Sequence, residues 1–387
     1  MNQTLKKELS MTACKIRMGA VTAVHSAKSG HPGGSLSAAD ILTYLYFQEM
    51  NVDPQDPKKD DRDRFVLSKG HIAPGLYSTL AHRGFFPVEE LKTLRKIGSR
   101  LQGHPDMKKI PGVDMTTGSL GQGISTACGM AKAAKLMNKD FRVYTLLGDG
   151  EIQEGQVWEA AMFAGHNKLD NLVVIVDNNG LQIDGNIADV CSPYPIDEKF
   201  KAFNFHVINI DGHNLDEIAA AFEEAKTVKG MPTAIVAKTV KGKGVSFMEN
   251  LASWHGTAPN DEQYEIAMAA AHYKLDNLVA VVDNNNLQID GEVNKVMSVY
   301  PIVDKFESFG WNVTTCDAHD FDSIHAAFEK TNEKNGKPWV IVQKSVKGKG
   351  VSFMENLASW HGTAPNDEQY AQAMADLEAI GKELEAE

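Results

Sequence analysis

Gly148-Asp149-Gly150-Glu151 follows FRVYTLL, the apolar run of residues 141–147, and this stretch decides the fold. A buried strand that ends in Gly-Asp-Gly puts a carboxylate at the carboxyl edge of a parallel sheet, where the glycines let a phosphate approach the backbone. A second apolar run, residues 172–176, ends in Asp177-Asn178-Asn179-Gly180-Leu181, so that Asn179 follows Asp149 by thirty positions. Because parallel strands end at the same edge, the sequence predicts that Asp149 and Asn179 lie close together.

The two strand ends supply the kinds of oxygen that Mg²⁺ prefers. Asp149 offers a carboxylate, Asn179 a neutral amide oxygen and Leu181 a backbone carbonyl. Together with a diphosphate they would form an all-oxygen coordination shell. A helix expected to begin near Glu154 would point its N-terminal dipole at the same diphosphate. We therefore expect Asp149, Asn179 and Leu181 to bind the metal, beside a diphosphate that lies against Gly150.

The order of the apolar runs predicts an α/β fold with a doubly wound parallel sheet, because strand patterns alternate with helix patterns after residue 147. Upstream, residues 5–28 and 37–49 have helical spacing, with Ser37 and Asp40 near the second start. The expected strands are residues 172–177, 207–211 and 233–238, and the expected helices are residues 154–167, 197–203 and 215–227.

The chain then repeats itself. Residues 240–264, VKGKGVSFMENLASWHGTAPNDEQY, recur letter for letter as residues 346–370, and His166 matches His272, so the offset is 106 residues in both cases. We interpret this as a tandem duplication of an α/β unit, with domains at residues 1–264 and 265–387, the second being a copy of residues 159–264. Its expected strands are residues 278–283, 313–316 and 340–344. Since the first copy alone directly follows the Gly-Asp-Gly strand, we expect it to complete the sheet.

Composition and charge exclude several classes of protein. The net charge of −12 is interspersed along the 387 residues, which argues against a nucleic-acid-binding or membrane surface. The polar start MNQTLKKE has no signal-peptide core, and no apolar run reaches the length of a membrane span. The four cysteines form no C-x-x-C pair and are expected to be reduced thiols in a cytoplasmic protein.

The Gly-Asp-Gly motif followed by Asn at this distance resembles the signature of thiamine-diphosphate-binding proteins, and the text around it, GDGEIQEGQVWEA, resembles transketolase. Further motifs follow in that family's order: SGHPGG (residues 29–34), SKGHIAP (68–74), GHP (103–105), TGSLGQG (117–123), KGKG (241–244) and SWHG (253–256). Any one loop histidine is by default only solvated, but six such motifs in the family's order are hard to obtain by chance.

The resemblance implies thiamine diphosphate and Mg²⁺ as cofactors and assigns roles to individual residues. Four histidines, His31, His71, His104 and His255, would face the substrate and the thiazolium ring, because imidazole suits proton transfer near neutral pH. The cofactor would contact Gly118, Ser119, Leu120, Asp149, Gly150, Asn179 and His255, and Lys241 would neutralise diphosphate charge. Glu154 matches a glutamate that links two active sites at the subunit interface, although an acid at a helix start is also favoured by the dipole alone.

The same resemblance implies partners. In transketolases the glutamate that activates the cofactor lies in a second, pyrimidine-binding domain, and the resemblance here does not reach it. We therefore expect the amino-terminal subunit of a split transketolase, which acts on sugar phosphates, forms a homodimer and needs a carboxyl-terminal subunit. Two alternatives stay open: a subunit of another thiamine-diphosphate-dependent synthase, such as the deoxyxylulose-phosphate type, and a catalytically silent duplicated variant.

Overall fold

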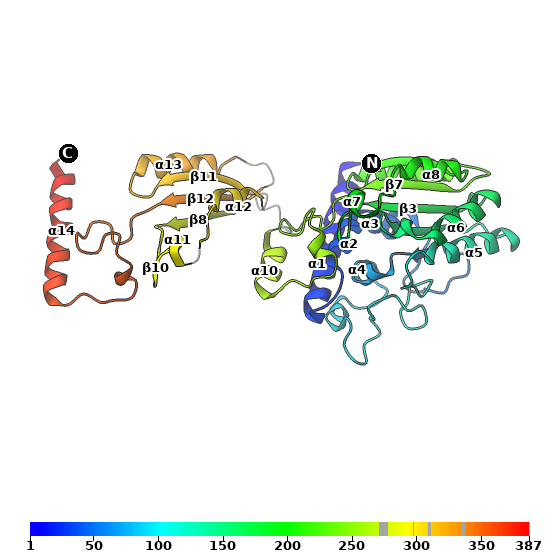
Figure 1. The fold of residues 1–387 in the computed structure, drawn as a ribbon, viewed down its shortest axis with the longest axis horizontal. Helices are drawn as coiled ribbons and strands as arrows, with labels where there is room; N and C mark the ends of the chain where they lie inside the picture. Colours follow the sequence, from blue (N-terminus) through cyan, green and yellow to red (C-terminus); the bar gives the residue numbers. More distant parts are fainter. Residues whose placement is uncertain (271–277, 297, 309–310, 334–336, 387) are drawn as a thin grey trace. The chain divides into compact units, whose positions relative to one another are not determined.

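The computed structural model describes residues 1–270, 278–296, 298–308, 311–333 and 337–386, and the chain divides into two compact units (Figure 1). Unit 1 spans Met1–His272 and unit 2 spans Tyr273–Glu387. Strands expected in the second copy are found in unit 2, and the strands that belong to the first copy are found in unit 1. No helix among the described residues is long and apolar enough to cross a membrane.

Unit 1 is built on one five-stranded sheet, in which all neighbouring strands are parallel. The first six residues of its central strand, LVVIVD, are all buried, as expected of a strand covered on both faces. The predicted fold class, an α/β chain with parallel sheets, is confirmed. In spatial order the strands are β1 (Arg64–Leu67), β2 (Val143–Gly148), β3 (Leu172–Asn178), β7 (Thr233–Lys238) and β6 (His206–Asp211).

Alternate side chains of the strands belong to two separate hydrophobic cores, because successive residues of a strand point to opposite faces. Val173 and Ile175 belong to one core, and Val174 and Val176 to the other. The first core is covered by α1 (Gln3–Ala27), α3 (Ala39–Tyr44), α4 (Ala73–Arg83) and α9 (Leu215–Thr227), and the second by α5 (Gly123–Leu136), α6 (Gly155–His166) and α8 (Ile196–Ala202).

The segment after α1 differs from the single helix expected over residues 37–49. It forms α2 (Pro32–Ser37), then α3, then a π-helical turn, Leu45–Glu49. The Ser37 hydroxyl donates to Asp177 over 2.6 Å, and Asp40 pairs with Arg17 and His213. A helix, α3, does begin at Ala39, with Asp40 in its first turn, near the expected start, but it is only six residues long. Ser37 and Asp40 also connect this segment to Asp177, Arg17 and His213.

Two smaller elements complete unit 1. A hairpin of β4 (Leu181–Gln182) and β5 (Gly185–Asn186) leads into α7 (Ile187–Cys191). Helix α10 (Asp261–Ala270) packs on α1, where the Tyr264 ring stacks on His25 with centroids 4.1 Å apart. Unit 1 therefore continues past residue 264, where the duplicated text first ends.

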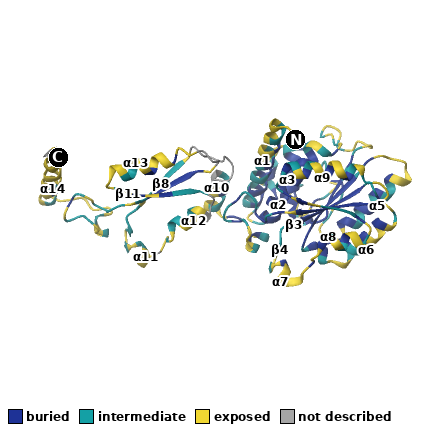
Figure 2. Ribbon diagram, turned by 90° about the horizontal axis from the view of Figure 1, so that it is seen from above, coloured by how far each residue is buried: buried dark blue, intermediate teal, exposed yellow. Residues whose placement is uncertain are grey.

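Unit 2 repeats the second half of unit 1 without the first half. Its parallel sheet has the order β11 (Asn312–Asp317), β12 (Trp339–Lys344) and β8 (Val279–Asn284). In unit 1, β3 lies between β2 and β7, but its counterpart β8 pairs with β12 alone among the described strands. Val281 is 46% exposed, whereas the matching Ile175 is fully buried. Figure 2 shows the strands of the unit 1 sheet mostly in the colour of buried residues. The other elements are β9 (Leu287–Gln288), β10 (Gly291–Glu292), α11 (Val293–Val296), α12 (Ile302–Ser308), α13 (Phe321–Lys330) and α14 (Asp367–Ala386).

Candidate active site

The ends of β2 and β3 are joined at the point where the sequence predicts a metal site. The Gly180 amide donates to Oδ2 of Asp149 over 2.5 Å, and the Asp149 amide donates to the Asp177 carbonyl over 3.3 Å. The other carboxylate oxygen of Asp149 accepts the Gly150 amide over 2.9 Å. These bonds hold the Asp149 carboxylate against the turn that carries Asn179 and Leu181.

Asp149 lies in an environment that disfavours its charge. It is 2% exposed, and burial together with the nearby Asp177 carboxylate raises the pKa of Asp149 to about 6. A divalent cation next to this carboxyl would favour the ionised form, because an opposite charge stabilises the carboxylate.

The turn after β3 offers the two other predicted ligand oxygens. The Asn179 side-chain oxygen accepts the Leu181 amide over 3.2 Å, and the Leu181 carbonyl accepts Lys241 Nζ over 3.1 Å. A carbonyl has two lone pairs, so this bond leaves one for a metal ion. One carboxylate, one amide and one carbonyl suit Mg²⁺ when a diphosphate supplies further oxygens. No cluster of three or more His, Cys, Asp or Glu side chains able to hold a metal is found in the described part of the chain.

Lys241 contacts both the turn with the expected metal ligands Asn179 and Leu181 and one of the four histidines. Its ammonium is 3.2 Å from Nδ1 of His255 as well as bonded to Leu181. It is 2% exposed, and burial with the neighbouring Lys69 lowers the pKa of Lys241 to about 8. A buried ammonium with a depressed pKa would gain from a nearby anion, so Lys241 is well placed to face a diphosphate.

Three of the four predicted histidines meet in space. The His31 and His71 ring centroids are 5.1 Å apart, those of His71 and His255 are 5.1 Å apart, and those of His31 and His255 are 5.4 Å apart. They come from the start of α2, the segment after β1 and the SWHG turn, so residues distant in the sequence form one cluster.

These imidazoles are neutral at physiological pH. Burial, with Arg95, His104 and Lys241 nearby, lowers the pKa of His31 to about 4. Burial and Lys241 lower the pKa of His255 to about 3, and burial with Lys69 also lowers the pKa of His71. Buried Nδ1 of His31 has no hydrogen-bond partner among the described residues, as expected of a group that meets a ligand. A neutral imidazole can accept a proton from a hydroxyl group and, once protonated, can return it, which suits proton transfer on hydroxyl groups.

His104 and the TGSLGQG loop lie together. A Cβ added to Gly118 would be 3.2 Å from the His104 ring, so the loop passes close to this histidine. Gly118, Ser119 and Leu120 are exposed, and Gly118 and Ser119 help line a cavity of about 280 Å³. Glu154 is also exposed and makes no side-chain cap, while a Cβ on Gly121 would lie 2.7 Å from its Cβ.

Sequence reasoning missed two buried acids that organise these loops. Glu151 is 2% exposed and accepts from the Ser68 hydroxyl over 2.5 Å and from the Gly121 and Gly148 amides over 3.0 Å each. Asp177 is fully buried and accepts from Lys69, Ser37 and Thr239. Burial alone would raise the pKa of Asp177, but the Lys69 ammonium and the hydroxyl donors outweigh it and lower the pKa. One signal in the sequence could have identified them: Asp177 is the next-to-last residue of a buried strand, which ends at Asn178, and Glu151 follows the end of another buried strand, Gly148, by three residues.

Comparisons with known proteins agree with this geometry. The model of the family "Transketolase, thiamine diphosphate binding domain" matches residues 9–267 and matches again over residues 262–379. The chain is 49% identical over 240 residues to the 6-deoxy-6-sulfo-D-fructose transketolase subunit SqwG of Clostridium sp. (strain MSTE9), covering 62% of this chain and 87% of that protein. It is 43% identical over 270 residues to an apulose-4-phosphate transketolase subunit of Phocaeicola vulgatus, covering 70% of this chain and 96% of that protein.

Longer transketolases match over a smaller share of their length. Human transketolase is 46% identical over 259 residues, which are 66% of this chain and 40% of that protein. The crystal structure of transketolase from Campylobacter jejuni superposes with a TM-score of 0.65 and 36% identity, covering 69% of this chain and 42% of that one. With two matches to one family model and these relatives, the chain belongs to the family of transketolase thiamine-diphosphate-binding domains.

Proposed function

We propose that this protein is the amino-terminal subunit of a split transketolase, which transfers a two-carbon ketol unit between sugar phosphates. The observation that carries the proposal is the junction of Asp149 with the Asn179–Leu181 turn, next to the cluster of His31, His71 and His255. The names of two relatives that this chain covers over most of their length, both transketolase subunits, support a split enzyme.

The residues present fit Mg²⁺ and the diphosphate of thiamine diphosphate. Asp149, Asn179 and the Leu181 carbonyl would hold the metal, and Lys241 would neutralise diphosphate charge. Gly118, Ser119, Leu120 and Gly150 would lie along the cofactor. When bound, thiamine diphosphate supplies the carbanion chemistry of its thiazolium ring.

The histidines would handle protons on the sugar. His31, His71 and His255 are neutral at pH 7 before the reaction, so each can take a proton from a substrate hydroxyl and then, as the imidazolium, return that proton to an alkoxide oxygen. His104, next to Gly118, would orient the sugar phosphate. The buried cluster would also exclude water from the reacting carbon atoms.

The test uses the purified full chain. We expect calorimetry to detect weak, Mg²⁺-dependent binding of thiamine diphosphate, with little ketol transfer until a carboxyl-terminal transketolase subunit is added. Full transketolase activity from this chain alone would refute the split-subunit proposal. A cofactor that never binds, with or without the partner, would favour a silent variant.

The proposed assembly includes at least a homodimer of this chain, in which Glu154 of each protomer lies near the active site of the other. The exposure of Glu154, Gly118 and Leu120 in the single chain is consistent with a surface that a partner covers. Light scattering at micromolar concentration should give at least twice the mass of 42.3 kDa, and a strict monomer would count against the dimer.

A further inference from the structure

The buried Asp177 carboxylate accepts hydrogen bonds from three separate segments of the chain. Lys69 comes from the loop after β1, Ser37 from the end of α2 and Thr239 from the residue after β7, and all three donate to this one carboxylate. The Lys69 side chain is itself 2% exposed and forms an ion pair with Asp177. A lysine is almost never fully buried unless it is paired, so this arrangement is a specific one.

Asp177 is in turn connected to the proposed metal ligands. Its backbone carbonyl accepts the Asp149 amide, and two residues further on the Asn179 side-chain oxygen accepts the Leu181 amide. The Asn179 amide makes no hydrogen bond to Asp177, although both residues belong to the described part of the chain. The Asp177 carboxylate therefore accepts its hydrogen bonds from the three other segments, and the Asn179 side chain is not bonded to it.

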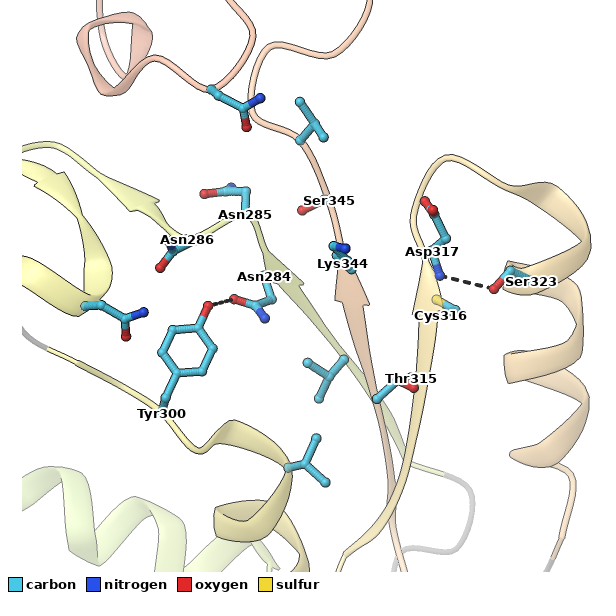
Figure 3. Close-up of a pocket in the computed structure, with 15 residues that line it drawn as sticks. Asn284, Asn285, Asn286, Tyr300, Thr315, Cys316, Asp317, Ser323, Lys344 and Ser345 are labelled. Atoms are coloured by element: carbon cyan, nitrogen blue, oxygen red, sulfur yellow. Dashed lines mark hydrogen bonds between the residues drawn. The ribbon is translucent and has the colours of Figure 1, made fainter.

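Unit 2 contains the same turn without Lys69 and Ser37, because both precede the duplicated segment. Asp283, Asn285 and Leu287 match Asp177, Asn179 and Leu181, and Ser345 matches Thr239 and donates to Asp283. In unit 2 the side-chain nitrogen of Asn285 bonds to the carboxylate: its Nδ2 donates to Oδ2 of Asp283 over 3.3 Å. The strand ends that carry Asn285 and Ser345 here border an open cavity of about 790 Å³ (Figure 3).

The backbone of the turn does not account for this difference. The residue after each asparagine is left-handed in both units, Gly180 with φ 76° and Asn286 with φ 57°. Both asparagine oxygens also accept the amide two residues ahead, over 3.2 Å in unit 1 and 3.0 Å in unit 2. The donors to the aspartate do differ, because an ammonium, that of Lys69, is among the donors to Asp177, and Asp177 is buried whereas Asp283 is exposed. The turn in unit 1 is also bonded to Asp149 through Gly180, and the repeat has no counterpart of Asp149.

We propose that Lys69 is a positioning residue for the Mg²⁺ site: by occupying the Asp177 carboxylate, it keeps the side-chain nitrogen of Asn179 from bonding to Asp177, so that the side-chain oxygen of Asn179 stays free to move onto the metal. This inference rests on the proposed function and adds a residue that does not itself touch the metal. A carboxylate that loses its ammonium partner would recruit the nearest neutral donor, as Asp283 recruits Asn285.

The experiment compares full-chain variants by Mg²⁺ affinity, measured calorimetrically with thiamine diphosphate, and by crystal structures without metal. Lys69→Met removes the donor and should weaken Mg²⁺ binding by about 10- to 100-fold, the range for partners that orient a metal ligand. Its crystal structure should show the Asn179 amide bonded to Asp177. Lys69→Gln keeps a donor without the charge and should retain most of the affinity. Lys344→Met, at an exposed strand end of unit 2, is the matched control and should change nothing.

A buried carboxylate without its partner can prevent folding, so Lys69→Met/Asp177→Asn removes both charges. This double variant should bind Mg²⁺ nearly as the unaltered chain does. If it loses as much affinity as expected for Lys69→Met, Lys69 acts on the metal or diphosphate directly and the proposal is overturned. An Asn179 side chain that does not turn in Lys69→Met also overturns it. An unaltered chain that binds no Mg²⁺ would refute the proposed function instead, while the orientation of Asn179 would still decide this inference.

Discussion

The Gly180 backbone amide donates a 2.5 Å hydrogen bond to Oδ2 of Asp149, which joins the ends of two neighbouring strands before any ligand is bound. Each Asp149 oxygen accepts one backbone amide, and hydrogen bonds of this kind favour the charged form of a carboxyl. Burial opposes them strongly enough that the net pKa is raised. The backbone amides therefore hold the Asp149 carboxylate in place, while burial disfavours its negative charge. A bound cation would compensate that charge.

Replacing Asp149 should abolish this preformed metal site. Asp149→Ala removes the one carboxylate among the proposed ligands, and we expect Mg²⁺-dependent binding of thiamine diphosphate to weaken by about 100-fold or more, since even outer partners of a metal account for about 10- to 100-fold. Isothermal titration calorimetry on the full chain measures this. Asp290→Ala, at an exposed position of unit 2, is the control. Equal affinities in the two variants would remove Asp149 from the metal site.

The buried histidines should make unit 1 sensitive to acid. The pKa of His255 is about 3 in the folded protein and about 6.5 in an unfolded chain, so between these values the unfolded state binds the extra proton. The free energy of unfolding should therefore fall as the pH is lowered from 6.5, and it should fall less steeply in His255→Asn. Urea unfolding between pH 7 and pH 5 checks this.

The second copy provides a matched control for that titration. His361 stands in an identical SWHG turn but is exposed. His361→Asn should leave the pH dependence of unfolding as it is in the unaltered chain. If both variants changed the slope equally, burial of the histidine cluster would not be the cause.

Glu151 should contribute to stability rather than to chemistry. Glu151→Ala would leave the Ser68 hydroxyl and the Gly121 and Gly148 amides without their common acceptor. Since each buried unsatisfied donor costs about 1–3 kcal/mol, we expect the free energy of unfolding to fall by about 3 kcal/mol or more. Glu159→Ala, on the exposed side of α6, should have little effect in the same urea titration. A similar small change in both variants would mean that water or other groups replace the Glu151 carboxylate.

The sequence predicted the strands and helices whose formation depends on the local pattern of apolar and turn residues. The strand expected over residues 172–177 is observed as β3, Leu172–Asn178, because a run of branched apolar residues bounded by Asp-Asn-Asn-Gly allows little else. The helix expected over residues 215–227 has the bounds of α9, Leu215–Thr227. Asp149 and the turn with Asn179 were expected at one sheet edge, and their connection through Gly180 follows from parallel pairing.

Contacts between distant segments were not predictable in the same way. Residues 37–49 have helical spacing, yet the structure divides the segment into the end of α2, α3 and a π-helical turn, and Ser37 and Asp40 bond to the distant Asp177 and His213. Neither the Lys69–Asp177 pair nor the bonds from Ser68 and Gly121 to Glu151 leave a periodic signal, since these partners lie tens of residues apart. The exposure of β8 likewise depends on elements that the repeated text does not contain, namely the neighbouring strand β2 and the helices α1, α3 and α4 that cover Ile175 in unit 1.

The two asparagines at the strand ends test which copy forms the site. Both turns contain Asn and Leu, as Asn179 and Leu181 and as Asn285 and Leu287, and each is followed by a KGKG loop and an SWHG turn. In unit 1, β3 pairs with β2, and the Asn179 turn is bonded to Asp149 through Gly180. In unit 2, Asn285 faces Asp283, whose strand β8 pairs with β12 alone among the described strands.

Asn179→Ala should therefore lower Mg²⁺-dependent cofactor affinity, by about 10-fold or more if the amide is a direct ligand. Asn285→Ala should leave the affinity unchanged, because no counterpart of the Gly-Asp-Gly strand precedes the second copy within the repeat. Calorimetry on both variants, with circular dichroism to establish that each is folded, makes the comparison direct. Loss in Asn285→Ala alone would show that the second copy takes the place of the first beside β2. Partial loss in both would mean that the two copies exchange in that position, within one chain or between subunits.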